Sequence, residues 1–140
     1  MQYQATGRFD LTKDTDPPYD DEPGATISRS LITKQFHGDL VGTSVTHLTQ
    51  IMTEVGGSAG YVAVERVVGT LHGRSGTFVL QHDALSDRGE RHLNIVVVPD
   101  SATGELAGLR GKLDVDISDG KHDYTLDYYF ADADAAAGAA

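Results

Sequence analysis

The chain alternates hydrophobic and polar residues in segments that are separated by glycine-containing turns. Alternation with a period of two is typical of β-strands that bury one face, and strand signals recur here about every 10–15 residues. The pattern predicts strands at residues 2–12, 25–36, 39–54, 58–71, 74–85, 90–99, 105–117 and 121–130. Helical periodicity is hard to find, so we predict an all-β protein.

The joints between these strands favour consecutive hairpins. Gly56–Gly57 and Asp119–Gly120 suit two-residue turns, which need positive φ angles, and His37–Gly38 and His72–Gly73 are weaker versions of the same signal. Eight hairpin-linked strands form a meander, and closing the meander removes its two exposed edges. We therefore expect a closed eight-stranded antiparallel meander β-barrel. Its narrow interior is filled by side chains or holds one small ligand.

Turn lengths determine which side chains share a face. With His72–Gly73 as a two-residue turn, Glu65 lies opposite Leu80 and points inward, whereas Arg66 points outward. Residues 86–89 are taken as a four-residue loop and residues 100–104 as a five-residue loop. The same count predicts an inward set of Tyr61, Ala63, Glu65, Val67, Phe78, Leu80, His82, Leu93, Ile95, Val97, Leu109, Leu113, Val115, Tyr124, Leu126, Tyr128 and Phe130.

Counting backwards extends the inward face to the first strands. Treating Gly56–Gly57 and His37–Gly38 as two-residue turns places Glu65 opposite Leu48 and turns Arg29 inward. Both faces of residues 40–52 are mixed in polarity, so the contrast is weaker here.

An inward glutamate in an apolar barrel must be paired or neutralised. Two interpretations of Glu65 remain open: it fixes the barrel's register through Arg29, a tyrosine hydroxyl or backbone groups, or it is a general base or hydrogen-bond acceptor at the floor of a pocket. Glu65 and His82 are the candidate catalytic residues. The candidate ligand-binding residues are Arg29, Gln50, Tyr61, Phe78, Leu80, Ile95, Tyr124 and Tyr128.

Composition excludes several functional classes. The net charge of −10 and the pI near 4.8 disfavour nucleic acid as a partner. The histidines lack metal-binding spacing, the glycines form no phosphate-binding loop, and there is no cysteine or G-x-S-x-G nucleophile. We expect no metal and no cofactor. Neither a signal peptide nor a membrane-spanning segment is recognisable, which favours a soluble cytoplasmic protein with no membrane partner.

The length of 140 residues suits one domain. We expect a single barrel over residues 1–130. The segment "DTDPPYDDEPG" carries five carboxylates and three prolines, so it predicts an acidic surface loop over residues 13–24 that is not a strand. Residues 131–140 are rich in alanine and predict a flexible tail.

Four segments carry a resemblance to a known family: "KQFHGDLVGTSV", "GSAGYVAVERVVGTLHGRSGTFVLQH", "VVPDSATGELAGLRGKL" and "DGKHDYTLDYYF". They resemble domain of unknown function 3224, a widespread bacterial family that looks like a small barrel similar to plant allene oxide cyclases. Those cyclases bind a fatty-acid-derived epoxide inside the barrel and steer its cyclisation with an inward glutamate, bound water and aromatic walls. The resemblance implies the same barrel here and an analogous place for Glu65.

Three functions are open at this stage. The first is a barrel that binds one small hydrophobic molecule and isomerises or cyclises it without a cofactor. The second is a carrier or sensor that binds such a molecule without chemistry. The third is a structural barrel with a filled interior that assembles as a homo-oligomer through its outer face.

Overall fold

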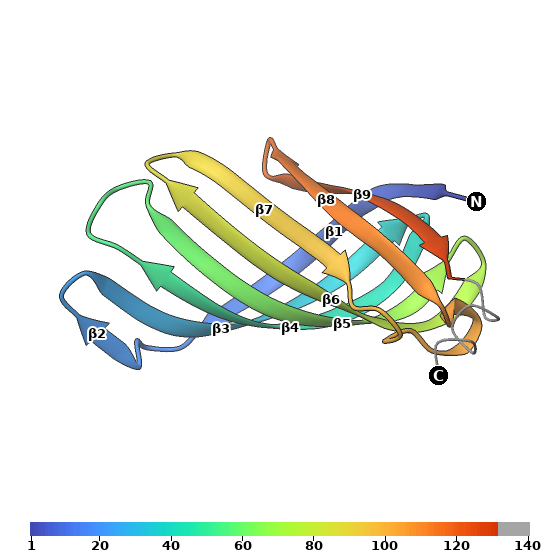
Figure 1. Cartoon of the computed structure of the whole chain (residues 1–140), viewed down its shortest axis with the longest axis horizontal. Coiled ribbons are helices and arrows are strands. Elements are labelled where there is room, and N and C mark those ends of the chain that lie inside the picture. The colour runs from blue at the N-terminus through green and yellow to red at the C-terminus, as the bar shows by residue number, and fades with distance from the viewer. Residues whose placement is uncertain (132–140) are drawn as a thin grey trace.

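Long antiparallel strands make up most of the fold in a computed structural model that describes residues 1–131. The elements are β1 (Tyr3–Thr15), β2 (Asp20–Glu22), β3 (Ala25–Gly38), β4 (Leu40–Met52), β5 (Ala59–Leu71), β6 (Arg74–Asp87), β7 (Glu90–Val97), the 3₁₀ turn η1 (Gly104–Leu106), β8 (Leu109–Ser118) and β9 (Lys121–Phe130) (Figure 1). The tail predicted over residues 131–140 lies outside the described residues from residue 132 onward.

Eight of the nine strands close into a barrel, as predicted. Each strand from β3 to β9 pairs with the next in antiparallel fashion, β9 pairs with β1, and β1 pairs with β3. Short β2 pairs with the first residues of β3, beyond the end of β1. The segment predicted as an acidic loop is therefore exposed but not strand-free, because β1 extends to Thr15 and β2 occupies Asp20–Glu22.

The barrel closes through a close approach of β1, β3 and β9. Gly7 pairs with Gly38 on one side and with Tyr124 on the other. A Cβ atom at Gly7 would lie 2.0 Å from the carbonyl oxygen of His37, so only glycine fits. The Tyr124 hydroxyl donates to the same carbonyl at 2.9 Å and accepts from the Leu40 N–H at 2.9 Å, which ties β9 to the β3–β4 connection.

The predicted register is confirmed at two hairpins. Glu65 lies opposite Leu80 in the β5–β6 pair, and Leu113 lies opposite Leu126 in the β8–β9 pair. The β6–β7 turn has two residues, Arg88 and Gly89, instead of the expected four. The partners in this pair shift by two positions, which leaves each side chain on its predicted face.

The β4–β5 pair shifts in the same way, because the connection between Met52 and Ala59 is longer than a two-residue turn. Thr46, not Leu48, therefore lies opposite Glu65. The shift is again by two residues, so both Thr46 and Leu48 keep the inward orientation that the count gave them.

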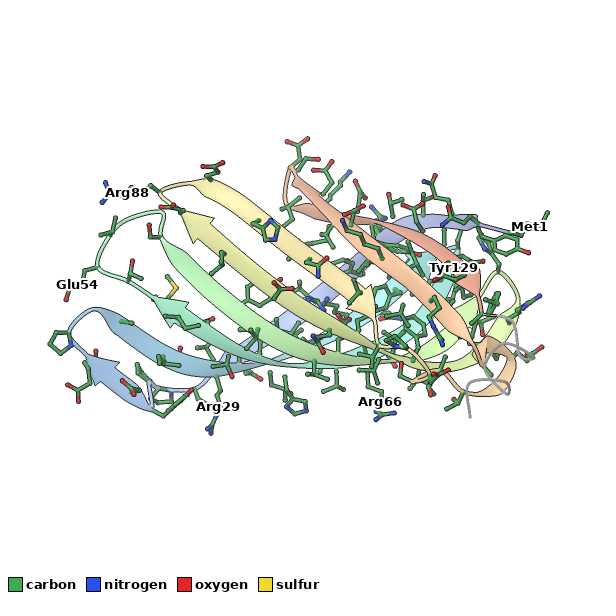
Figure 2. The ribbon with its side chains drawn as sticks, in the orientation of Figure 1. Met1, Arg29, Glu54, Arg66, Arg88 and Tyr129 are labelled. Atoms are coloured by element: carbon green, nitrogen blue, oxygen red, sulfur yellow. The ribbon has the colours of Figure 1, made fainter. Side chains whose placement is uncertain are left out.

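The predicted inward orientation of Arg29 is wrong. The last β3–β4 pair joins Phe36 to Gly42, so an odd number of residues separates the strands and every side chain of β3 reverses its face. Gly38 has a φ of 104°, and the Asp39 backbone N–H donates to the Thr6 carbonyl, which anchors this wider turn to β1. Arg29 lies outside the barrel with its guanidinium 4.5 Å from the centre of the Tyr19 ring (Figure 2).

The interior has a filled half and an open half. The filled half is a continuous apolar core that Leu106 of η1 helps to plug. Its largest buried members include Phe36, Leu71, Phe78, Leu80, Leu109, Tyr124, Leu126 and Tyr128. The open half contains a smaller apolar cluster of Ile32, Leu48 and Ala63 with Tyr61 packed against it. A cavity therefore occupies only this second half.

One seam of the barrel is weakly paired. β7 and β8 are paired at a single position, Val96 with Lys112, whereas the other neighbouring barrel strands pair over seven or more positions. Residues 91–93 of β7 border the cavity on one side of this seam, and residues 115–117 of β8 border it on the other. The mouth of the open half therefore extends along the gap between β7 and β8. No helix among the described residues is long and apolar enough to span a membrane.

Candidate functional site: a cavity above a buried ion pair

The open half of the barrel holds a cavity of about 790 Å³. Such a volume suits one small organic molecule. Apolar residues form most of its wall: Phe9, Leu11, Ile32, Leu48, Tyr61, Ala84, Leu93, Ile95 and Val115. The polar groups that reach it from deeper in the barrel are Lys34, Thr46 and His82.

Lys34, Thr46 and His82 form the floor of the cavity. Glu65 lies beneath this floor and is completely buried. Its Oε1 accepts hydrogen bonds from Lys34 Nζ at 3.1 Å and from His82 Nε2 at 2.8 Å, and its Oε2 accepts one from Ser44 Oγ at 2.6 Å. These partners come from β3, β4 and β6, so the glutamate joins four adjacent strands. The predicted inward orientation of Glu65 is confirmed by its burial. Arg66 is exposed and points outward, as predicted (Figure 2).

The Glu65 carboxylate is ionised. Burial alone would raise its pKa, but the hydrogen bond from His82, the charge of Lys34 and the hydrogen bond from Ser44 together lower the pKa to about 2. The Lys34 cation balances this buried negative charge. The site therefore contains a neutral ion pair, and Glu65 does not itself border the cavity.

Lys34 presents its ammonium group to the cavity. Its side chain is only 7% exposed, and Nζ lies 4.6 Å from the centre of the Phe9 ring. One of its three N–H groups is used by Glu65, so the other two can donate to a ligand. Lys34 was not among the predicted site residues, because the error at the β3–β4 turn placed Arg29 inward instead. The usable signal was Phe36, a large aromatic residue that shares the face of Lys34.

His82 has its tautomer determined by Glu65. An ionised carboxylate only accepts hydrogen bonds, so Nε2 carries a proton and a neutral ring leaves Nδ1 with a free lone pair. Among the described residues Nδ1 has no hydrogen-bond partner, and His82 borders the cavity. The centroids of the Tyr61 and His82 rings lie 6.2 Å apart. Burial and then the charges of Glu65 and Asp83 raise the pKa of Tyr61, so its hydroxyl remains protonated at neutral pH.

Thr46 adds an unsatisfied group to the floor. It is 1% exposed, and its Oγ1 is the buried side-chain polar atom of residues 1–131 that lacks a hydrogen-bond partner. Thr46 of β4 pairs with Ile32 of β3 on one side and with Glu65 of β5 on the other, and it borders the cavity. A buried hydroxyl without a partner is costly, so it suits a site where a bound molecule supplies the partner.

The structure divides the predicted ligand-binding residues into three groups. Gln50, Tyr61 and Ile95 border the cavity. Phe78, Leu80, Tyr124 and Tyr128 point inward as predicted but pack in the filled half, away from the cavity. Arg29 lies outside the barrel. Among residues 1–131 no group of three or more histidine, aspartate or glutamate side chains is arranged to hold a metal ion.

Fold and site together define a small, closed β-barrel with a one-sided cavity above a buried ion pair. The chain belongs to the DUF3224 family, a family of proteins of unknown function whose sequence model matches residues 5–128. The family membership inferred from the sequence is thereby confirmed.

A solved structure supports this assignment. The crystal structure of a DUF3224 family protein of unknown function from Shewanella oneidensis MR-1 is similar to this chain, with a TM-score of 0.90 and 40% sequence identity. The alignment covers 95% of this chain and 100% of that one. No protein with curated annotation matches the sequence. The likeness to allene oxide cyclases stays a prediction.

Proposed function

We propose that this protein binds one small, mainly apolar molecule in the open half of its barrel. The observation that supports the proposal most directly is the 790 Å³ cavity itself, which has an apolar wall and is bordered at its deep end by Lys34, Thr46 and His82. A barrel built only as a scaffold gains nothing from an empty half, because an unfilled interior loses packing contacts. An apolar wall above a few convergent polar groups is the usual composition of a small-molecule site.

The test is a fluorescence titration with N-phenyl-1-naphthylamine, a neutral apolar dye that brightens in dry pockets. We expect saturable binding of one dye per chain. Ala84→Trp places an indole into the cavity and should abolish binding, whereas Val62→Trp on the exposed outer face should not change it. Absence of saturable binding, or equal binding by both variants, would overturn the proposal.

A second candidate function is isomerisation or cyclisation of the bound molecule without a cofactor. It is favoured by His82, whose free Nδ1 borders the cavity while Glu65 orients the ring. His82 Nδ1 would take a proton from the carbon beside a carbonyl group. The electron pair of that C–H bond then forms an enolate, whose oxygen Lys34 stabilises by hydrogen bonding. Where the bound molecule is a β,γ-unsaturated carbonyl compound, the enolate is a conjugated dienolate. Return of the proton to its γ-carbon gives the α,β-unsaturated isomer, and no oxidant or reductant is needed.

In this mechanism Glu65 is a positioning residue, because it acts through His82 and Lys34 and does not touch the bound molecule. Deuterium exchange tests the proton transfer without knowledge of the natural substrate. With 2-decanone in D₂O, we expect the protein to accelerate deuterium incorporation at the carbons beside the carbonyl. His82→Phe should remove the acceleration and retain dye binding. Exchange no faster than in buffer would leave a carrier or sensor as the function.

A further inference from the structure

Ionisable side chains that point into the barrel differ sharply in charge from the rest of the chain. Strand parity places seven such residues of the barrel strands inside: Lys13, Lys34, Glu65, Arg74, His82, Arg91 and His122. Only Glu65 among them is acidic, although the whole chain has 21 acidic and 11 basic residues. The interior therefore has the opposite sign to the outer surface.

Three of the inward cations make no ion pair among the described residues, and one of them, Arg74, lies against Phe130 in the filled half, away from the cavity. The other two are Lys13 and Arg91. Glu65 pairs with Lys34, whereas neither Lys13 nor Arg91 makes an ion pair among the described residues. Both border the cavity and both are exposed, which places them at its mouth on β1 and β7. Among residues 1–131, the one acidic residue that borders the cavity is Asp116, on the outward-facing parity of β8.

From this charge distribution we infer that the ligand is an organic anion with an apolar body. Its acidic group, a carboxylate or sulfonate, lies at the mouth between Lys13 and Arg91. The apolar body contacts the wall formed by Ile32, Leu48 and Ile95. The inference rests on the proposed function, since it names the class of molecule that the cavity binds.

The floor accepts the opposite, uncharged end of the molecule. The charge of Lys34 is already balanced by Glu65, so a second anion at the floor would be buried without a cation of its own. Lys34 and Thr46 can instead donate to a neutral oxygen such as a carbonyl group. The polarity of the cavity thus sets an orientation, with the anionic group outward and the acceptor oxygen inward.

Two dyes with nearly the same aromatic body test the inference. Anilinonaphthalene sulfonate carries a sulfonate group that N-phenyl-1-naphthylamine lacks, so the ratio of their dissociation constants reports the preference for an anion. In the Lys13→Met/Arg91→Met variant we expect the sulfonate to bind about tenfold more weakly, while the neutral dye binds as before. In the original protein the preference should weaken at high salt, because exposed charges are screened.

Arg66→Met/Lys112→Met is the matched control. It changes the net charge equally but removes cations from the outer face. If the two double variants show the same dye ratio, the anion inference is overturned and the cavity remains a site for neutral molecules. If neither dye binds the original protein, the proposed function itself fails. Ala84→Trp confirms that both dyes occupy the cavity, and circular dichroism confirms that each variant is folded.

Discussion

Lys34 Nζ lies 3.1 Å from Glu65 Oε1, and both side chains are buried, Lys34 at the cavity floor and Glu65 beneath it. They come from β3 and β5, which are separated by β4. A buried ion pair costs desolvation energy that its attraction barely repays, so its presence is not explained by stability alone. A pocket that needs a rigid, directed N–H donor gives a reason for its presence, because the ionised glutamate holds the ammonium group in place.

The first prediction concerns the loss of this partner. Glu65→Gln should lower the free energy of unfolding by about 3 kcal/mol, because it leaves a buried cation unpaired. The exposed residue Glu54 provides the control, and Glu54→Gln should change stability by less than about 0.5 kcal/mol. Urea denaturation of the three proteins measures both values.

A double variant separates the pair from the glutamate itself. Lys34→Met/Glu65→Gln removes both charges and should recover much of the stability that Glu65→Gln loses. Equal stability of the single and double variants would show that the cation is not the source of the loss.

The second prediction concerns pH. The pKa of Glu65 is about 2 in the folded protein, below the ordinary glutamate value of 4.5, so the ionised form is favoured by folding. Its stabilisation is fully present above pH 4.5 and is lost as the pH falls towards 2. The stability difference between the original protein and Glu65→Gln should therefore narrow over this interval. Urea denaturation at a series of pH values measures it, and a constant difference would mean that folding does not lower the pKa of Glu65.

The third prediction contrasts Arg29 with Lys34. Arg29 lies on the outer surface against Tyr19, so Arg29→Ala should cost less than about 1 kcal/mol and leave dye binding unchanged. Lys34→Ala should destabilise the protein more, because the buried Glu65 carboxylate loses its cation. It should also weaken dye binding at the floor. Similar effects of the two variants would contradict the observed orientation of β3.

Glu65 and Arg29 show where prediction from the sequence succeeded and where it failed. The alternation from Tyr61 onward was strong enough to give the correct faces even where the partner residues shifted by two, and Glu65 was placed correctly. Shifts of one or three residues are different, because they turn every side chain of the strand to the opposite face of the sheet. The β3–β4 turn was such a case, since Gly38 and Asp39 form a wider connection that depends on contacts with β1. A contact between distant strands cannot be read from local turn residues.

The division of the interior into a filled half and an open half also could not be predicted from the sequence. Parity predicts that Tyr124, Tyr128, Phe78 and Tyr61 point inward, but it does not say how far along the barrel axis each one lies. That position depends on the tilt of the strands and on the plug that η1 forms with Leu106. Three of these aromatic residues consequently pack in the filled half, and of the four only Tyr61 borders the cavity.

The fourth prediction assigns Tyr124 to structure rather than to binding. Its hydroxyl accepts from the buried Leu40 N–H and donates to the His37 carbonyl, so Tyr124→Phe leaves both backbone groups without this partner. We expect a loss of about 1–3 kcal/mol in unfolding free energy and unchanged dye affinity. Urea denaturation and the dye titration measure the two quantities. Reduced affinity in a fully folded variant would restore Tyr124 as a ligand contact.

The last prediction concerns the seam between β7 and β8. Beyond the single pair of Val96 with Lys112, the backbone amides of residues 91–95 that point towards β8 have no strand partner. In hydrogen exchange measured by NMR they should exchange much faster than the amides of β5, which is paired along both edges.

Both sides of this seam border the cavity, so a molecule bound there contacts β7 and β8 together. Saturation with N-phenyl-1-naphthylamine should therefore slow exchange at residues 91–95 and leave the amides of residues 126–130 unchanged, because this part of the β8–β9 pair does not border the cavity. Equal protection in β5 and β7 without dye would mean that the seam is closed in solution. Slowing at every strand alike would mean that the dye stabilises the whole barrel and that the seam does not respond on its own.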